Sequence, residues 1–289
     1  MSPPEIDVFV AVDWSGAKGP AYDGIAVATC RLGTHAPTLV GAPGRRWRRA
    51  DFVDWLAAQA QRAERVLVGI DCAFALPALA AEQWLGADYH VAALWDYIDR
   101  CCEDAVDFYG GDFADRTEHQ SQFWRIGKRP DRFQELHRAG ELACRAAGLG
   151  APESPLKLVG ARQVGKGGIA GMRVLASLRR TLGDDFRVWP FDSPERAQMI
   201  CVELYPRLFM RMTEHGNTKV RSWDALQRCL MALDSEPYGG TRDLPSDHET
   251  DALVAAAGLR RIASDPAVWN PPGLDALARR AEGWIFGVR

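Results

Sequence analysis

The sequence lacks the features that mark several large classes of protein. Its first ten residues contain no basic stretch followed by an apolar one, so we expect no signal peptide. No apolar run approaches the ~18 residues of a membrane-spanning helix, so we expect no membrane partner. The seven cysteines include no C-x-x-C pair, which is unlike a zinc site or a disulfide framework. Reduced thiols and a cytoplasmic location follow as expectations.

An excess of basic charge is also missing. The chain has 35 Lys and Arg against 38 Asp and Glu, a net charge of -3, which is unlike a protein that coats nucleic acid over its whole surface. This balance still permits a local basic patch. The sequence has no internal repeat and no low-complexity segment. Its 289 residues have an ordinary globular composition and are enough to bury a sizeable core.

Hydrophobic periodicity indicates a protein built from both strands and helices. Apolar or alternating runs predict strands at 6–13, 24–31, 38–42, 66–72, 186–189 and 199–205. Helical spacing predicts helices at 51–65, 94–108, 132–147, 222–232, 247–263 and 275–284. Three strands joined by short turns, followed by a helix and a buried strand, predict an α/β fold with a mixed sheet flanked by helices. We interpret the chain as one domain, residues 1–289, with a long, mostly helical insertion or lid at 76–192.

Three carboxylates lie at the ends of predicted strands. Asp13 precedes a Ser-Gly turn, Asp71 follows "VLVGI", and Glu203 stands within "ICVELYP". Ligands of open α/β sheets bind outside the carboxyl ends of the strands, and a buried carboxylate is costly unless it is paired, hydrogen-bonded or metal-bound. Each residue also has a simpler interpretation. Asp13 and Asp71 can accept backbone N–H bonds, and Glu203 can pair with an arginine such as Arg207.

A fourth acidic group opens a late predicted helix. Ser246 and Glu249 form a capping-box pattern, and negative charge is favourable in the first turn. Asp251 lies beyond that turn, where the apolar run begins. At 100° per residue, Asp247 and His248 lie within roughly 60° of Asp251 around the helix. Converging oxygen ligands favour Mg²⁺ or Mn²⁺, and two such ions ~4 Å apart can activate water against a phosphodiester.

Two further motifs are candidates for contacting nucleic acid. "GARQVGKGG" at 160–168 is close to a phosphate-binding loop, but Gly167 replaces the Ser or Thr that would hold Mg²⁺. A surface loop is the simpler interpretation, and Lys166 is the candidate phosphate contact. "GRRWRRADF" places Arg45, Arg46, Arg48 and Arg49 around Trp47, which suits stacking and phosphate binding as well as a solvated loop. A second basic group accompanies two aromatic residues: Arg125, Lys128, Arg129, Arg132, Phe123 and Trp124.

The order of these features resembles the RNase H-like superfamily, in particular the Holliday-junction resolvase branch. In that superfamily the first strand, the fourth strand and the last helix supply the metal ligands. Asp13, Asp71 and Asp251 match those positions, and the earlier helical ligand would be Asp247 or His248. More closely, "AVDWSG", "VGIDCAFALP", "VELYPR" and "DHETDALVAA" resemble a bacterial and archaeal family known as a domain of unknown function and described by fold as predicted RNase H-like nucleases.

This resemblance implies an RNase H-like fold with a magnesium or manganese site and a nucleic acid substrate. We therefore predict a two-metal-ion nuclease that hydrolyses phosphodiester bonds in DNA or RNA. The predicted metal ligands are Asp13, Asp71, Asp251 and Asp247. The predicted catalytic residues are Asp13, Asp71, Asp251, Glu203 and His248. The predicted substrate contacts are Lys166, Arg46 and Arg48.

Two other functions are compatible with the same motifs. Sugar kinases and actin-like ATPases also begin with a strand that ends in Asp and a Gly turn, as in "DWSG". Those proteins usually carry a second Asp-Gly phosphate loop, which "IDCAFALP" does not supply. The other alternative is a non-catalytic RNase H-like scaffold that binds nucleic acid or protein. The grouped carboxylates argue against a scaffold, because buried acids are costly without a function.

Overall fold

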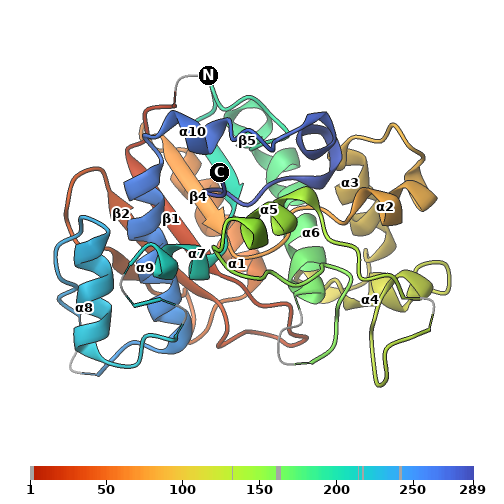
Figure 1. The fold of residues 1–289 in the computed structure, drawn as a ribbon, viewed down its shortest axis with the longest axis horizontal. Coiled ribbons are helices and arrows are strands. Elements are labelled where there is room, and N and C mark those ends of the chain that lie inside the picture. The colour runs from red at the N-terminus through yellow and green to blue at the C-terminus, as the bar shows by residue number, and fades with distance from the viewer. Residues whose placement is uncertain (1–2, 132, 161–163, 214, 217, 241–242) are drawn as a thin grey trace.

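The computed structural model describes residues 3–131, 133–160, 164–213, 215–216, 218–240 and 243–289 (Figure 1). In this part of the chain a mixed six-stranded sheet has the strand order β3-β2-β1-β4-β6-β5. Strand β1 is antiparallel to β2, β2 is antiparallel to β3, and β1, β4, β6 and β5 run parallel to one another. The strands are β1 (Val8–Asp13), β2 (Ala26–Arg31), β3 (Thr38–Val40), β4 (Val66–Ile70), β5 (Phe186–Val188) and β6 (Met199–Glu203).

Helices cover both faces of this sheet because its central strands are apolar on both sides. In β1, Val10 and Val12 face one core, while Phe9 and Ala11 face the other. All five residues of β4 and of β6 are buried. Strands covered on both faces read as continuous apolar runs rather than alternating ones. The sheet is therefore the middle layer of three (Figure 1).

The first helical layer comes from the N-terminal half and the middle of the chain. Helix α6 packs against α1 and α3, and Phe52, Leu94 and Met172 bring these helices into the core with Val10 and Val12. The helices up to this point are α1 (Arg49–Ala60), α2 (Ala78–Leu85), α3 (Val91–Cys101), α4 (Gly111–Asp115), α5 (Ala139–Ala146) and α6 (Gly165–Leu182).

The second layer centres on α9, which lies along β1 and β2 (Figure 1). Small residues let this helix approach its neighbours closely. A Cβ atom at Gly258 would lie 2.2 Å from the ring of Phe209, and Cys30 of β2 donates a hydrogen bond to the Ala256 carbonyl at 3.3 Å. The helices of the C-terminal part are α7 (Pro206–Arg211), α8 (Trp223–Ala232), α9 (Asp247–Ile262) and α10 (Pro266–Trp269). None of the described helices is both long and apolar enough to cross a membrane.

The predicted α/β class with a mixed, helix-flanked sheet is confirmed, and each predicted strand is present in shorter form. The loop predicted at 160–168 is wrong for Gly165–Gly168, which begin α6, and 161–163 lie outside the described residues. The helix predicted at 275–284 is present at 276–282, and its Ala278–Glu282 part is π-helical. The one predicted at 132–147 is confined to α5, and Arg132 is also outside the described residues.

Candidate functional site

Four carboxylates meet at one edge of the sheet because of strand order and direction. Strand β4 runs parallel to both β1 and β6, so the carboxyl ends of all three strands lie together. Val12 pairs with Ile70, and Ile70 pairs with Glu203, which makes Asp13, Asp71 and Glu203 neighbours across the sheet. Helix α9 packs on β1 and brings Asp251 and His248 to the same edge. We call Asp13, Asp71 and Asp251 the acidic cluster.

The buried carboxylate of Asp13 is fixed by His248. The Nδ1 atom of His248 lies 2.7 Å from Asp13 Oδ2. This hydrogen bond, with the negative charge of Asp13, raises the pKa of His248 above its ordinary value, although burial acts in the opposite direction. His248 is therefore the helical residue that contacts Asp13. Asp247 is half-exposed, and its Oδ2 atom lies 3.6 Å from Arg221 Nη2.

Only one of the two carboxylate oxygens of Asp251 has a hydrogen-bond partner among the described residues. Its side chain is buried, and Oδ2 accepts a hydrogen bond from Lys219 Nζ at 2.6 Å. Its other oxygen, Oδ1, is buried and has no hydrogen-bond partner among the described residues. Burial raises the pKa of Asp251 to about 6, against the opposing effect of the Lys219 ammonium. A buried oxygen without a partner is uncommon and marks a place where a further group belongs.

Asp71 carries the least compensated charge of the cluster. Its side chain forms no hydrogen bond or ion pair with any described residue, although it stands among other acids. Burial raises its pKa well above the usual value, and repulsion from Asp13 and Asp251 raises it further. Lys219 is a cation that counteracts this effect. Groups with such shifted pKa values concentrate at functional sites.

The side chains of the acidic cluster do not form a complete metal site in this structure. Across the described residues, no three side chains of His, Cys, Asp or Glu form a group that could hold a metal ion. Two members of the acidic cluster are bonded to basic side chains instead, Asp13 to His248 and Asp251 to Lys219. A cation that bound all three carboxylates would have to take over the role that the Lys219 ammonium has in this structure.

Glu203 has a different environment, because both of its oxygens are hydrogen-bonded to Arg138. Arg138 Nη1 donates to Glu203 Oε2 at 2.8 Å, and Nη2 donates to Oε1. Arg138 also pairs with Glu141, and the Phe74 N–H donates to Glu203. The prediction that Glu203 pairs with an arginine is confirmed, but the partner suggested from sequence, Arg207, is wrong. Sequence reasoning missed Arg138 because it lies 65 residues away in the chain.

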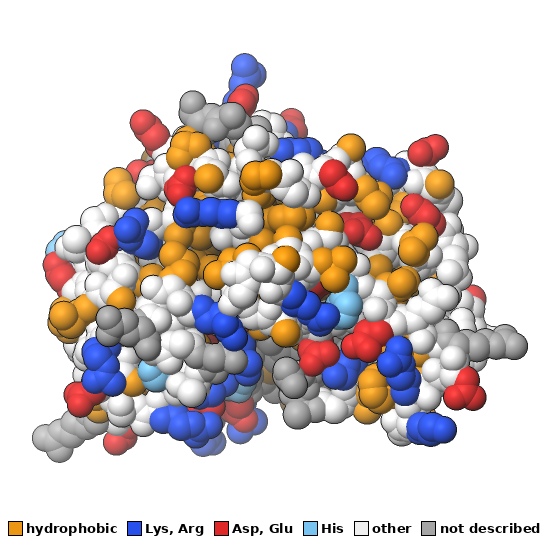
Figure 2. Space-filling view, viewed as in Figure 1, with side chains coloured by type: hydrophobic (Ala, Val, Ile, Leu, Met, Phe, Trp, Pro, Cys, Tyr) orange, Lys and Arg blue, Asp and Glu red, His pale blue; other side chains and the backbone are white. Residues whose placement is uncertain are grey.

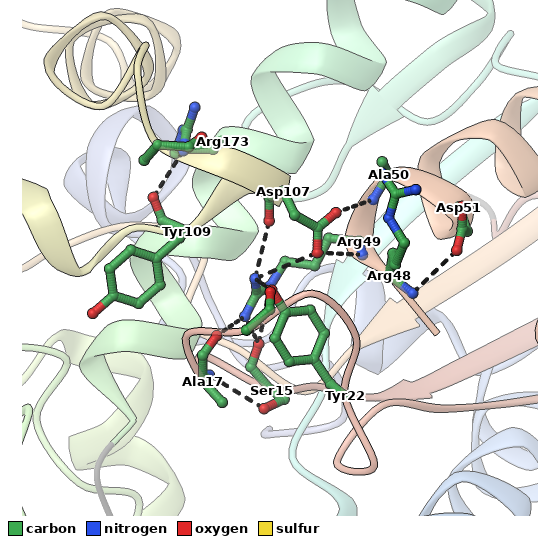
Figure 3. Close-up of polar contacts among 12 residues, drawn as sticks. Ser15, Ala17, Tyr22, Arg48, Arg49, Ala50, Asp51, Asp107, Tyr109 and Arg173 are labelled. Carbon is green, nitrogen blue, oxygen red and sulfur yellow. Dashed lines mark hydrogen bonds and ion pairs between the residues drawn. The ribbon is translucent and has the colours of Figure 1, made fainter. Parts of the chain in front are cut away.

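A buried arginine holds the loop that follows Asp13 (Figure 3). Arg49, at the start of α1, is completely buried and donates to the carbonyls of Ser15 and Ala17 and to the Tyr22 hydroxyl. The carboxylate of Asp107 accepts the backbone N–H groups of Arg49 and Ala50. These bonds fix the loop against α1. Of the four arginines in this sequence motif, Arg46 and Arg48 are the predicted substrate contacts, whereas Arg49 is the one that holds the loop after Asp13.

The turn after Asp13 also contacts the start of α6. A Cβ atom on Gly16 would lie 2.2 Å from the Gly167 nitrogen, so only glycine allows this approach of two backbones. The Trp14 indole donates to the Gly167 carbonyl at 3.1 Å. Lys166 lies in the same first turn of α6 and is half-buried. The predicted phosphate contact Lys166 is therefore next to the loop that carries Asp13.

A cavity of about 290 Å³ opens beside Asp71. Its walls come from the carboxyl ends of β1, β4 and β6 and from the first turns of α5, α6 and α7. They include Trp14, Asp71, Arg138, Tyr205 and Arg207. The cavity has the position that ligand sites have in open α/β sheets, and its volume is close to the lower end, roughly 300 Å³, of small-molecule sites.

The predicted arginine contacts lie elsewhere. Arg46 is paired with Asp23 and, with Arg48, lines a separate hollow near the start of α1. In the second basic group, Arg125 and Arg129 pair with acids, and Phe123 is completely buried. Figure 2 shows basic and acidic side chains interspersed over the visible face. Arg46 and Arg48 are not brought to the cavity beside Asp71.

Comparisons of this chain with protein-family models, with curated proteins and with solved structures gave no match. A function must therefore be inferred from the chemistry of the acidic cluster and of the cavity beside it.

Proposed function

We propose that this protein is an RNase H-like nuclease that hydrolyses phosphodiester bonds in DNA or RNA with the help of Mg²⁺ or Mn²⁺. The observation that carries the proposal is the acidic cluster, in which β1, β4 and α9 each contribute one carboxylate. Asp71 has no partner among the described residues, and Asp251 Oδ1 is buried without one. The strand order β3-β2-β1-β4-β6, with β1 antiparallel to β2 and parallel to β4, agrees with an RNase H-like sheet.

The chemistry of the donor set suits a hard divalent cation. Asp13, Asp71 and Asp251 would hold it, because carboxylate oxygens are the ligands that Mg²⁺ and Mn²⁺ prefer. A bound cation would relieve the repulsion that raises the pKa of Asp71 and would supply a partner for Asp251 Oδ1. When bound, it would stabilise the negative charge that develops on the phosphate. Asp247 is left out of this set because it is half-exposed and its carboxylate lies 3.6 Å from Arg221.

One of the protein's own side chains can supply the proton that hydrolysis needs. A water oxygen forms a bond to phosphorus and releases its proton to bulk solvent, the bond from phosphorus to the leaving oxygen breaks, and the leaving oxygen takes up a proton. Asp71 would hold the cation during this step and is not assigned a proton transfer. His248, whose pKa is raised by Asp13, is suited to donate a proton to the leaving oxygen. Lys166 lies near enough to the loop of Asp13 to contact a neighbouring phosphate.

The environment of the Ser-Gly turn favours this function over a kinase or an ATPase. In those proteins the turn after the first strand wraps around phosphates of ATP. Here the backbone of Gly16 packs against that of Gly167, so this side of the turn is already covered by protein. A scaffold without activity is disfavoured because three like charges, held together without a ligand, cost free energy.

A cleavage assay with matched variants tests the proposal. Labelled single-stranded, duplex and branched DNA and RNA are incubated with Mn²⁺ and with the wild-type protein, Asp71→Asn or Asp251→Asn. Asp88→Asn is the control, because Asp88 is fully exposed. We expect cleavage to fall by about 10²-fold or more in the first two variants, because each removes a carboxylate that would hold the cation, and to be unchanged in the control. Absence of cleavage by the wild-type protein, or equal activity of Asp71→Asn, would contradict the proposal.

A further inference from the structure

Most of the charged residues that line the cavity beside Asp71 are already paired with another residue. Six of its lining residues are charged, and four of them are paired. Arg138 is bonded to both Glu203 and Glu141, and Glu153 pairs with Lys157 at 3.2 Å. The two lining residues that remain are one acid and one base, Asp71 and Arg207.

Arg207 has no partner in the described structure. It stands in the first turn of α7 and is half-buried, yet it forms no hydrogen bond or ion pair with any described residue. An arginine guanidinium presents five N–H donors in a fork that matches the oxygens of a phosphate. A half-buried guanidinium on a cavity wall, with its donors unused, is thus suited to receive an anion from outside the protein.

The same cavity offers aromatic surface. Trp14 and Tyr205 both line it, and the indole of Trp14 is held by its hydrogen bond to the Gly167 carbonyl. Aromatic side chains bind the bases of unpaired nucleotides by stacking, whatever the base. The cavity volume of about 290 Å³ leaves room for a single small ligand and none for a double helix.

We propose that this cavity binds one unpaired nucleotide of the substrate strand, with its phosphate on Arg207 and its base against Trp14 and Tyr205. The proposal rests on the nuclease function inferred above and specifies its substrate class. A base can enter the cavity only after it leaves the stack and its pairing partner, which costs free energy in an intact duplex. The protein therefore cuts single-stranded or frayed nucleic acid in preference to a closed duplex.

Nucleotide binding without any metal tests the cavity independently of cleavage. Thymidine 5′-monophosphate and thymidine are titrated in EDTA into the wild-type protein, Arg207→Gln and Arg228→Gln by isothermal titration calorimetry. Arg228 is an exposed arginine on α8 and serves as the control. We expect the monophosphate to bind about tenfold more tightly than thymidine, as for a charge-assisted contact, and Arg207→Gln to abolish this difference. Absence of monophosphate binding, or unchanged binding in Arg207→Gln, would overturn the proposal.

Cleavage with Mn²⁺ tests the substrate class. The wild-type protein should cut a single-stranded oligonucleotide at least about tenfold faster than the same strand in a closed duplex, because of the cost of unpairing. Arg207→Gln should raise the KM for the single strand and change kcat little, and Arg207→Lys should restore part of the affinity. Ala151→Trp, which fills the wall of the cavity, should act in the same direction as Arg207→Gln.

The outcomes separate the two proposals. Equal cleavage of duplex and single strand would overturn the cavity assignment and leave the nuclease function standing. Nucleotide binding that depends on Arg207, without cleavage of any substrate, would overturn the nuclease function and support the cavity as a nucleotide site. Circular dichroism of each variant shows whether it has folded, and Arg207→Lys provides a second variant if Arg207→Gln does not fold.

Discussion

At the scale of single residues, the acidic cluster lowers the stability of the ligand-free protein. Asp71 is an acid in a place where an acid is unfavourable, next to Asp13 and Asp251 and largely removed from water. Proteins keep such residues where a ligand or a reaction needs them, at a cost to the stability of the ligand-free state. Lys219 and His248 reduce this cost only in part, since each is bonded to a different carboxylate.

Replacing Asp71 by Asn should stabilise the metal-free protein at neutral pH. In the folded protein the pKa of Asp71 is raised above its value of about 3.9 in the unfolded chain. Below a pH of about 3.9 Asp71 is neutral in both states and costs no stability. As the pH rises toward the folded-state pKa, the unfolded chain gives up this proton more readily, so the folded protein loses stability. An amide avoids this loss. We expect Asp71→Asn to raise the free energy of unfolding by about 1 kcal/mol at pH 7.5, as for other site residues under strain, and by almost nothing at pH 4.

Urea denaturation in EDTA at both pH values measures this effect, with Asp88→Asn as the exposed control. A variant that is less stable than the wild-type protein at pH 7.5 would show that the Asp71 carboxylate is favourably bound in the metal-free state.

The affinity for a divalent cation should depend on pH through Asp251. Its pKa is about 6, and a carboxylate must lose its proton to bind a metal ion. We expect the Mn²⁺ affinity to fall by at least about tenfold per pH unit below the pKa of Asp251. Calorimetric titrations between pH 5 and pH 8 measure it. An affinity that does not change over this range would exclude Asp251 as a ligand.

At the scale of secondary-structure elements, the site depends on how the loop after β1 is held. Arg49 of α1 donates hydrogen bonds to this loop (Figure 3). The first turn of α6 packs against its Gly16. Asp107 is held in the left-handed region with a φ of 49° and caps α1 through its carboxylate. The position of Asp13 is thus determined by contacts between elements as well as by the sheet.

Substituting Gly16 by Ala should disrupt this arrangement. The added Cβ would lie 2.2 Å from the nitrogen of Gly167, a backbone atom that cannot turn away. We expect a loss of about 1–3 kcal/mol, as for other overpacked sites, together with loss of activity. Gly19→Ala in the same loop is the matched control, because its nearest neighbour would be the Tyr22 ring at 3.7 Å. Thermal denaturation of both variants measures the difference, and equal stability of the two would contradict it.

At the scale of the whole molecule, Arg138 joins parts that are distant in the chain. It starts α5, pairs with Glu203 at the end of β6 and donates to the carbonyl of Glu282 near the C-terminus. The carboxylate of Glu282 in turn accepts the N–H of Ala78 at the start of α2. This buried network ties the segments around the cavity to the sheet.

Replacing Arg138 by Met should therefore destabilise the whole fold. The change leaves Glu203 and Glu141 buried without a positive partner, and breaking a buried pair in this way costs about 3–5 kcal/mol. Urea denaturation at pH 7.5 measures the loss. The triple variant Arg138→Met, Glu141→Gln, Glu203→Gln removes the stranded charges and should recover part of the stability. No recovery would mean that the shape of Arg138, rather than its charge, is what the fold requires.

The sequence by itself determined the strands, half of the described α-helices and the three acids of the cluster. These signals are local, because apolar runs and a capping box reflect interactions between residues close in the chain. The sequence did not indicate α6, whose first turn is rich in glycine and was therefore interpreted as a loop. That helix forms because its apolar side packs into the core with α1 and α3.

Only the tertiary structure decided the partners. His248 rather than Asp247 contacts Asp13, and Arg138 rather than Arg207 pairs with Glu203. Lys219 donates a hydrogen bond to Asp251. These contacts depend on which side chains meet when elements that are far apart in the chain pack together. The spacing of residues along the sequence does not specify them. Among the described residues, the same pairing leaves Asp71 and Arg207 without partners on one cavity. The acids can be read from the sequence, but the two unpaired charges that we propose for the substrate appear only when the chain is folded.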